Sequence, residues 1–276
     1  MSDPVKMKTA VTLCRVPEMA AGPFVFHDEL DVAFAKAAAC GFDAVELFFS
    51  GPDEVPVETI RALCEQFGLG VAAVGSGAGM VKHGLSLTDP SPEKRRAALD
   101  FILRMIEFGG RLGAPCILGS MQGKWGGEIS RERALELLAG SFSTINKAAA
   151  DASVPFIYEP LNRYETNLFN RQLPAAEFLS AHGFANIVLL ADLFHMNIEE
   201  ADIAQAIRDA GSKVGHVHWA DSNRLAMGSG HTDSAAIADA LREISYQGYI
   251  SAEIFTGGDP DLAARHTLAS IRKCNL

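Results

Sequence analysis

The sequence predicts a (β/α)8 barrel, in which eight parallel strands alternate with eight helices. Short apolar runs alternate with segments of helical period along the whole chain, without a Pro- or Ser-rich linker or a low-complexity stretch. The runs are almost wholly apolar, which is typical of parallel strands covered by helices. The length of 276 residues fits one barrel of about 250 residues. We therefore expect residues 1–276 to form a single TIM-barrel domain.

An open, doubly wound sheet is the alternative for such a pattern. It would need a glycine-rich first turn to bind a dinucleotide, and the segment from Cys14 to Phe26 lacks one. We therefore favour the closed barrel.

Four strands are expected in the first half of the chain, at 9–13, 44–48, 71–74 and 116–118. Helices are expected at about 28–39, 57–67, 92–112 and 131–150. Gly41 and Gly68 are placed to end the first two helices, and Ser91-Pro92 to begin the third. The glycine-rich stretch 75–79 lacks a following Lys-Ser/Thr pair, so it predicts a flexible wall rather than a phosphate loop.

The expected strands of the second half each end in a side chain that can bind a metal ion. The strands lie at 156–159, 188–192, 214–218 and 249–253, with helices near 175–181, 203–210, 234–244 and 261–273. The terminal residues are Glu159, Asp192, His218 and Glu253, which are 33, 26 and 35 residues apart. Because such strand ends meet at one rim of a barrel, these side chains should converge.

Three carboxylates and one imidazole suit a divalent cation such as Mn²⁺ or Mg²⁺. A buried carboxylate without a partner costs several kcal/mol, roughly, so a cation or a guanidinium must accompany each one. The alternative for each residue is therefore a pair with an arginine or a helix cap.

Two further polar residues lie on the expected strands. Glu46 faces the same rim by register, where it is a candidate for a substrate contact or for a structural bond to the first loop. His216 points the same way as His218 but one layer deeper. We expect it to be a hydrogen-bonded core histidine rather than the ligand.

The bulk properties exclude several classes of function. A net charge of −10 disfavours nucleic acids and anionic membranes as partners. The five cysteines include no CxxC pair, so we expect reduced thiols rather than a zinc or redox motif. The segment from Met1 to Lys8 lacks an apolar stretch and no run approaches 18 apolar residues, which favours a cytoplasmic protein.

Four motifs in the second half resemble a known family. They read Glu-x-Leu-Asn-Arg-Tyr-Glu from Glu159, Asp-x-Phe-His-Met-Asn from Asp192, His-Val-His-x5-Arg from His216 to Arg224, and Ala-Glu at Glu253. In this order they resemble the xylose-isomerase-like sugar isomerases and epimerases, especially ketose 3-epimerases of the tagatose and psicose type.

The resemblance implies the roles of the site residues. Glu159, Asp192, His218 and Glu253 would hold one divalent ion, with Mn²⁺ expected and Mg²⁺ or Co²⁺ as alternatives. Glu165, His195 and Arg224 would bind the oxygens of a sugar. The family also implies a homo-oligomer, either a dimer or a tetramer.

A metal-dependent epimerisation follows from these roles. The cation would polarise a ketose carbonyl and acidify the neighbouring C–H group. Glu159 or Glu253 would remove that proton to give a cis-enediolate, and the other glutamate would return a proton from the opposite face.

The sequence departs from the ketose epimerase pattern at several positions. Pro160 follows the first ligand, and a Gly-x-Gly-His-x-Asp turn spans residues 228–233. The segment 119–124 resembles that of relatives acting on keto-sugar acids. Lys124 is a candidate contact for the carboxylate of such a substrate, although an exposed loop lysine is the commoner outcome. The expected substrate is therefore a free ketose or a keto-sugar acid.

Other functions remain open on the same fold. An aldose–ketose isomerase and an inosose-type dehydratase share the barrel and the metal. A three-zinc DNA repair endonuclease would need further ligands on the first four strands, which end in Leu13-Cys14, Leu47-Phe48, Val74-Gly75 and Leu118-Gly119. A sugar-binding barrel without turnover is the non-enzymatic alternative.

Overall fold

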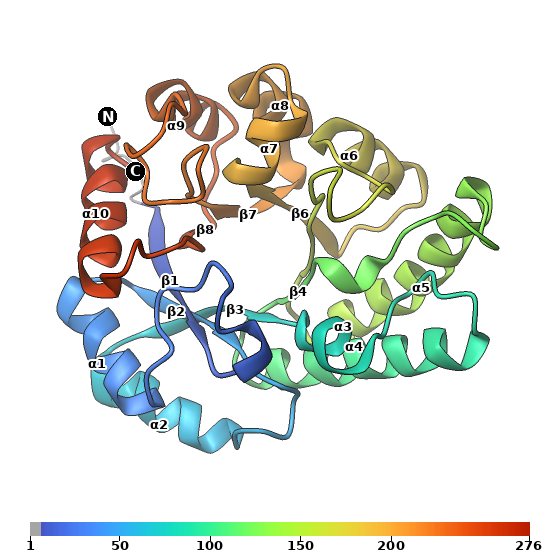
Figure 1. The fold of residues 1–276 in the computed structure, drawn as a ribbon, viewed down its shortest axis with the longest axis horizontal. Helices are drawn as coiled ribbons and strands as arrows, with labels where there is room; N and C mark the ends of the chain where they lie inside the picture. The colour runs from blue at the N-terminus through green and yellow to red at the C-terminus, as the bar shows by residue number, and fades with distance from the viewer. Residues whose placement is uncertain (1–6) are drawn as a thin grey trace.

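Eight parallel strands close into a barrel in chain order in the computed structural model, which describes residues 7–276 (Figure 1). The barrel closes because β1 pairs with β8 as well as with β2. The strands are β1 (Lys8–Cys14), β2 (Ala44–Phe48), β3 (Gly70–Gly75), β4 (Cys116–Leu118), β5 (Phe156–Tyr158), β6 (Ile187–Asp192), β7 (Val214–His218) and β8 (Tyr249–Ala252). This confirms the predicted (β/α)8 TIM-barrel fold.

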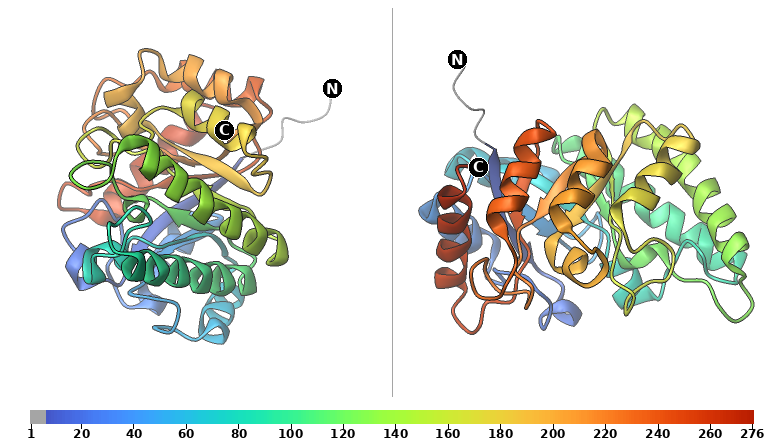
Figure 2. Two further views of the ribbon diagram at one scale, coloured as in Figure 1. Left: turned by 90° about the vertical axis from the view of Figure 1, so that its right-hand side faces the viewer. Right: turned by 90° about the horizontal axis from the view of Figure 1, so that it is seen from above.

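The eight expected helices surround the strands (Figure 1), and two further views show helices on the outside of the barrel (Figure 2). They are α1 (Leu30–Cys40), α2 (Val57–Phe67), α4 (Pro92–Arg111), α5 (Arg131–Asp151), α6 (Gln172–Ala181), α8 (Ile203–Ala210), α9 (Ser234–Glu243) and α10 (Pro260–Lys273). Within residues 7–276, no helix has the length and apolar character needed to cross a membrane.

The predicted helix ends agree with the backbone geometry. Gly41 and Gly68 follow α1 and α2 with φ of 90° and 66°, the left-handed conformation that glycine adopts without a Cβ penalty. Ser91 precedes α4, and its hydroxyl accepts a hydrogen bond from the backbone N–H of Lys94.

Two short α-helices were not predicted. Helix α3 (Ala78–His83) begins within the glycine-rich stretch and divides the expected loop between β3 and α4 into residues 76–77 and 84–91. Helix α7 (Leu193–Glu199) follows β6 without a connecting loop, because the carboxylate of Asp192 caps its first turn. Both helices are too short to give a periodic apolar pattern.

The barrel interior is apolar at mid-height and polar at the carboxyl ends of the strands. Small and branched side chains fill the interior, including a cluster of Ala73, Ile117, Ile157 and Leu190. Asp192 and His218 are buried at the ends of β6 and β7, and the buried Glu46 lies in the middle of β2. Glu46 contacts His218, so that these side chains form one connected group with Glu159 and Glu253 at the carboxyl end of the barrel.

Candidate metal and sugar site

The four residues predicted to bind a metal ion lie together at the carboxyl end of the barrel. Asp192 and His218 are the last residues of β6 and β7, whereas Glu159 and Glu253 directly follow β5 and β8. All four are at most 7% exposed. One oxygen or nitrogen atom from each lies within 4.8 Å of the others. The donor set therefore has the chemistry and the spacing that a single divalent cation requires.

The imidazole of His218 presents its two nitrogen atoms to different neighbours. Nδ1 lies 3.3 Å from Oδ2 of Asp192 and 3.4 Å from Oε2 of Glu253. Oε1 of Glu159 is 4.0 Å from the same nitrogen. Nε2 lies 3.0 Å from Oε1 of Glu46 on the other side of the ring. Nδ1 is therefore the nitrogen that faces the ligand set.

Protons are distributed unevenly over the ligand set in the metal-free protein. Burial, together with the charge of Glu253, raises the pKa of Glu159 well above its ordinary value. Burial alone would also raise the pKa values of Asp192 and Glu253, but neighbouring cationic side chains, including Arg224, lower them. Burial alone would lower the pKa of His218, but Glu253 and Glu46 raise it well above its ordinary value. A divalent cation would replace the protons that Glu159 and His218 then carry.

Asp192 uses its two carboxylate oxygens for different purposes. Oδ1 accepts hydrogen bonds from the backbone N–H groups of Phe194 at 2.8 Å and His195 at 3.2 Å. Oδ2 points toward His218 and lies 3.5 Å from Nη2 of Arg224. The alternative interpretation as a helix cap is thus correct for one oxygen, while the other oxygen belongs to the ligand set.

His195 presents an N–H group to the same space. Its Nδ1 accepts a hydrogen bond from the backbone N–H of Asn162 at 3.3 Å, so Nε2 carries the proton of the neutral ring. Nε2 lies 3.7 Å from both Oε1 of Glu159 and Oδ2 of Asp192. Burial lowers the pKa of His195, which favours this neutral form. The position of Asn162 was not recognised from the sequence as one that orients His195.

Arg224 lies beside the ligand set and contacts Glu253, which directly follows β8. Its Nη2 lies 2.6 Å from Oε2 of Glu253, and its guanidinium carbon is 4.8 Å from the ring centre of Phe194. The Nε atom of Arg224 is buried and has no hydrogen-bond partner among residues 7–276. The backbone of Arg224 has φ of 59°, an uncommon value for a residue with a side chain. Arg224 also lines the cavity, so its guanidinium lies within reach of a ligand there.

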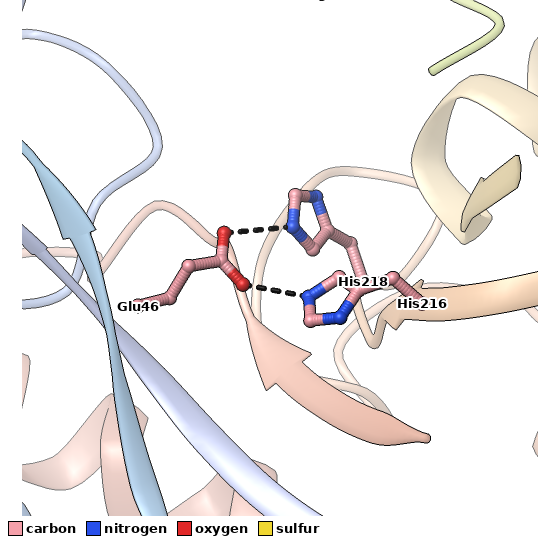
Figure 3. A group of neighbouring side chains, drawn as sticks. All are labelled: Glu46, His216 and His218. Atoms are coloured by element: carbon pink, nitrogen blue, oxygen red, sulfur yellow. Dashed lines mark hydrogen bonds and ion pairs between the residues drawn. The ribbon is translucent and has the colours of Figure 1, made fainter. Parts of the chain in front are cut away.

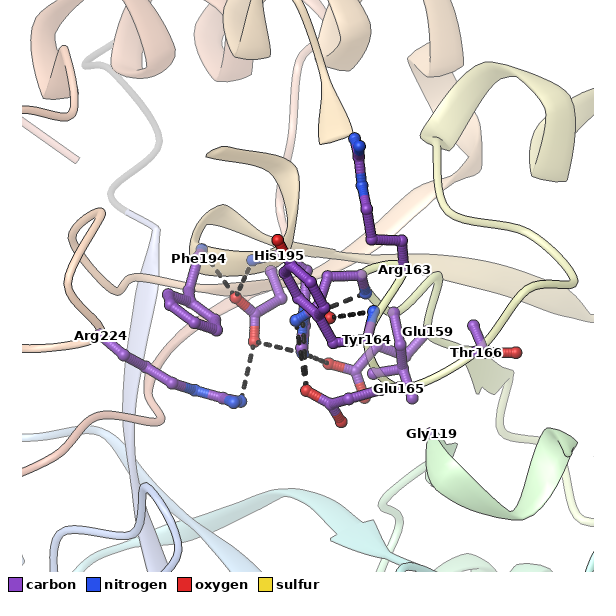
Figure 4. A network of polar contacts seen from close by, with 12 residues as sticks. Gly119, Glu159, Arg163, Tyr164, Glu165, Thr166, Phe194, His195 and Arg224 are labelled. Carbon is purple, nitrogen blue, oxygen red and sulfur yellow. Dashed lines mark hydrogen bonds and ion pairs between the residues drawn. The ribbon is translucent and has the colours of Figure 1, made fainter. Parts of the chain in front are cut away.

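Glu165 lies at the outer edge of the site. Its Oε1 accepts a hydrogen bond from Nδ2 of Asn162 at 3.3 Å and is 3.9 Å from Nδ1 of His195 (Figure 4). Its side chain is 42% exposed, so it faces the entrance rather than the buried ligand set.

A cavity of about 300 Å³ opens onto these residues. Charged and polar side chains, among them Glu159, His195 and Arg224, line the cavity together with apolar ones. The apolar lining residues are Met19, Pro23, Phe24, Phe48, Val81, Ile117 and Leu161. Among the described residues, Arg224 is the only lysine or arginine that lines the cavity, and Glu18 and Glu165 add negative charge near it. The cavity combines oriented polar groups with apolar faces, as a sugar requires.

Gly119 and Gln122, which follow β4, hold Glu159 in place. A Cβ added at Gly119 would lie 2.7 Å from Oε2 of Glu159, so the carboxylate needs the space that glycine leaves. Nε2 of Gln122 donates a hydrogen bond to the backbone carbonyl of Glu159 at 2.9 Å. The sequence signal for this contact is the glycine that directly follows β4, the strand that pairs with β5.

Other polar residues of the motifs lie outside the ligand set. Arg163 points away from it and pairs with Glu199 at 2.9 Å (Figure 4). Lys124 is exposed and does not line the cavity, so nothing places it near a substrate carboxylate. His216 is a buried, hydrogen-bonded core histidine, as predicted. The expected contact of Glu46 with substrate or with the first loop is wrong, because both of its oxygens bind histidines.

Fold and site together define a barrel enzyme with a carboxylate- and histidine-rich centre, and the family follows from comparison with known proteins. A family model described as the xylose isomerase-like TIM barrel matches residues 34–274. The chain belongs to this family.

The chain is similar to several sugar epimerases. It is 32% identical over 234 residues to an L-ribulose 3-epimerase of Mesorhizobium japonicum, covering 83% of this chain and 77% of the relative. It is 30% identical over 261 residues to a 3-dehydro-D-guloside 4-epimerase of Escherichia coli, covering 90% and 96%. The crystal structure of an E. coli 3-keto-D-glucoside 4-epimerase superposes with a TM-score of 0.81 at 26% identity, covering 98% of this chain and 100% of that one. The protein is thus an enzyme that acts on carbohydrates.

Proposed function

We propose that residues 1–276 form one catalytic domain that epimerises an uncharged keto sugar with the help of one divalent metal ion. The observation that carries this proposal is the buried set of Glu159, Asp192, His218 and Glu253, whose ligand atoms lie within 4.8 Å of one another beside a cavity. The similarity to ketose 3-epimerases and to a keto-glycoside 4-epimerase supports the reaction class.

The four residues fit a divalent cation. Three carboxylates buried this close together repel one another, and His218 and Arg224 offset part of their charge within the site. Oxygen and imidazole ligands suit Mn²⁺, with Mg²⁺ and Co²⁺ as alternatives. When bound, the cation would act as a Lewis acid that polarises the carbonyl group of the sugar.

Glu159 and Glu253 are the groups that would move the proton. They follow β5 and β8, so that β6 and β7 lie between them along the rim. One carboxylate would take the proton from the carbon next to the carbonyl, which leaves a cis-enediolate. The other would return a proton to the opposite face of that carbon, and its configuration would invert.

Three further residues would bind and orient the sugar. His195 would offer the N–H group on Nε2, and Arg224 would offer its guanidinium, which lines the cavity. Glu165 offers a carboxylate at the cavity entrance, where it would accept a hydrogen bond from a hydroxyl group. Together these groups supply both donors and acceptors for a polyhydroxylated ligand.

An uncharged ketose or keto-glycoside fits the cavity better than a keto-sugar acid. Arg224 is paired with Glu253 at 2.6 Å and is the only arginine or lysine among the described lining residues. Glu18 and Glu165 would repel a carboxylate or phosphate group on the substrate. The exposed position of Lys124 removes the reason for expecting a keto-sugar acid.

A panel of free ketoses, keto-glycosides and keto-sugar acids incubated with Mn²⁺ in D₂O tests the reaction. We expect deuterium at the inverted carbon of an uncharged substrate. Loss of water would instead favour the inosose-type dehydratase, and formation of an aldose would favour the isomerase. A stoichiometric sugar complex without turnover on any substrate would favour the sugar-binding barrel.

Replacement of either glutamate tests its role in proton transfer. Glu159→Gln and Glu253→Gln should each lower kcat by at least ~100-fold, because a positioned acid or base contributes about 10² to 10⁴-fold. Mn²⁺ content must be measured for each variant, so that loss of the metal is separated from loss of the base. A variant that retains Mn²⁺ and a normal rate would exclude its residue from proton transfer.

A further inference from the structure

Glu46 joins two histidines across the interior of the barrel. It projects from β2 and is fully buried. Its Oε1 lies 3.0 Å from Nε2 of His218 and its Oε2 lies 2.7 Å from Nε2 of His216 (Figure 3). Strands β1 and β8 separate β2 from β7 around the barrel, so the two hydrogen bonds cross its interior. An ionised carboxylate only accepts hydrogen bonds, so each Nε2 atom must carry a proton.

We propose that Glu46 is a positioning residue for His218 and sets its ability to bind the metal ion. When Nε2 of His218 donates to Glu46, the lone pair of the neutral ring is on Nδ1. That nitrogen faces Asp192 at 3.3 Å and Glu253 at 3.4 Å. A carboxylate behind a metal-binding imidazole fixes its tautomer and orientation and makes it a stronger ligand.

His216 completes the arrangement by holding Glu46. Because it occupies the second oxygen of Glu46 at 2.7 Å, the carboxylate group cannot rotate without losing a hydrogen bond. Both histidines come from β7 with one residue between them, so their rings lie on the same face of the strand. The two histidines therefore have different roles. His218 faces the ligand set, and His216 supports the Glu46 carboxylate that orients His218.

Glu46 does not belong to the ligand set itself. It lies against Nε2 of His218, whereas the other ligands lie against Nδ1, and it does not line the cavity. A second metal ion between Glu46 and the two histidines would have to replace both hydrogen bonds. It would also have to share the ring of His218 with the first ion. The hydrogen-bonded arrangement satisfies all four atoms without either change.

A contribution to folding alone is a poor explanation for Glu46. Taking a carboxylate out of water is costly, and an apolar residue of similar volume is often as stabilising at a buried position. The carboxylate of Glu46 is instead explained by its contact with His218, which provides the imidazole of the ligand set.

Titration of Mn²⁺ into the metal-free full-length protein, measured by calorimetry, tests the inference, which rests on the metal-binding part of the proposed function. Glu46→Leu removes both acceptor oxygens at similar volume and should weaken Mn²⁺ binding by about 10- to 100-fold. Glu46→Gln keeps one acceptor oxygen and should give an intermediate affinity. If the wild-type protein does not bind Mn²⁺, the proposed function is wrong. If the wild-type protein binds Mn²⁺ and the Glu46 variants bind it equally tightly, only the role of Glu46 is wrong.

Thr267→Val is the matched control. Thr267 is buried in α10 and uses its hydroxyl to bind the carbonyl of Ala263 at 3.1 Å. Its replacement should lower the melting temperature but leave the Mn²⁺ affinity within about threefold, because it removes a buried polar group that does not touch a ligand.

The tautomer of His218 can be measured in the wild-type protein, so this test does not depend on the folding of a variant. Nitrogen NMR of ¹⁵N-histidine-labelled wild-type protein with bound Mg²⁺ should find the proton of His218 on Nε2. A proton on Nδ1 would overturn the inference. So would a folded Glu46→Leu variant that binds Mn²⁺ as tightly as the wild-type protein, since Glu46 would then affect folding alone.

Discussion

Several side chains of this site interact with two neighbours through different atoms. Asp192 caps α7 with Oδ1 and faces the ligand set with Oδ2. His218 binds Glu46 through Nε2 and presents Nδ1 to the same set. In each case the first interaction fixes the direction in which the second atom points. Such preorganisation keeps a metal ligand in place before the ion arrives.

Gly119→Ala should disturb Glu159 without changing a charged residue. The new methyl group would lie 2.7 Å from Oε2 of Glu159, which is shorter than a van der Waals contact. We expect Mn²⁺ affinity and kcat to fall by at least ~10-fold, because the carboxylate must leave its position. Calorimetry and steady-state rates measure the two effects.

Gly140→Ala is the control for that substitution. Gly140 lies within α5, and a Cβ there would contact nothing within 4 Å. It should stabilise the protein by roughly 0.5–1 kcal/mol and leave Mn²⁺ binding unchanged. Equal behaviour of the two alanine variants would contradict the contact between Gly119 and Glu159.

Metal binding should release protons, since Glu159 and His218 have raised pKa values in the metal-free protein. Below those pKa values the ion must displace a proton from each group, so the apparent affinity for Mn²⁺ rises with pH. Asp192 and Glu253, whose pKa values are lowered, are already ionised and release none. Calorimetry at pH 6 in buffers of different ionisation enthalpy should give a release of about one to two protons. A heat that is independent of the buffer would contradict this assignment.

At the scale of elements, Glu165 and Arg224 lie in loops that follow strands, whereas His195 lies in α7, which directly follows β6. Arg224 belongs to the loop between β7 and α9, and this loop is organised around Asp221. The carboxylate of Asp221 accepts hydrogen bonds from the backbone N–H groups of Ser222, Gly228, Gly230 and Thr232 at 2.6–3.0 Å. The backbone N–H of Arg224 also donates to the carbonyl of Asp221 at 2.8 Å. The position of Arg224 thus depends on a residue that does not touch the cavity.

Asp221→Ala should loosen this loop. Leaving its backbone donors without an acceptor should cost about 2–3 kcal/mol of stability, and KM should rise as Arg224 loses its position. Asp239→Ala is the matched control, because Asp239 forms an exposed ion pair with Arg242 and should change stability by less than about 1 kcal/mol. Chemical unfolding and steady-state kinetics provide the measurements.

The pH dependence of the same variant checks the cause. Burial alone would raise the pKa of Asp221, but the four backbone donors lower it far below its ordinary value. A carboxylate with a lowered pKa stabilises the fold fully above its unfolded pKa of about 3.9, and this contribution is lost as pH falls below it. The stability difference between the wild-type protein and Asp221→Ala should therefore shrink below about pH 4. A constant difference would point to lost packing instead.

At the scale of the whole molecule, the metal ligands join the last four strands of the barrel. The closed barrel brings together residues that are up to 94 positions apart in the chain, from Glu159 to Glu253. An ion that binds only this arrangement must stabilise the folded state. We therefore expect metal binding and barrel stability to be coupled.

Mn²⁺ at a free concentration of 100 times its Kd should stabilise the fold by ~2.7 kcal/mol. For a chain of this size this corresponds to a rise in Tm of roughly 5–10 °C, which chelation should reverse. Asp192→Asn keeps a capping oxygen for α7 but removes the charge of one ligand, so the rise should largely disappear. An equal rise in that variant would mean that Mn²⁺ stabilises the protein from another place.

The sequence by itself determined the barrel and the rim of the site. Apolar runs that end in Glu159, Asp192, His218 and Glu253 predict convergence, because parallel strands of a barrel end at the same face. The tertiary structure alone decided which polar neighbours support them. Glu46 and His218 are 172 residues apart and meet across the barrel, and Gly119 gives space to Glu159 from the next strand. Periodicity and capping are local properties of the chain, whereas the direction of a hydrogen bond between distant strands depends on the closed barrel.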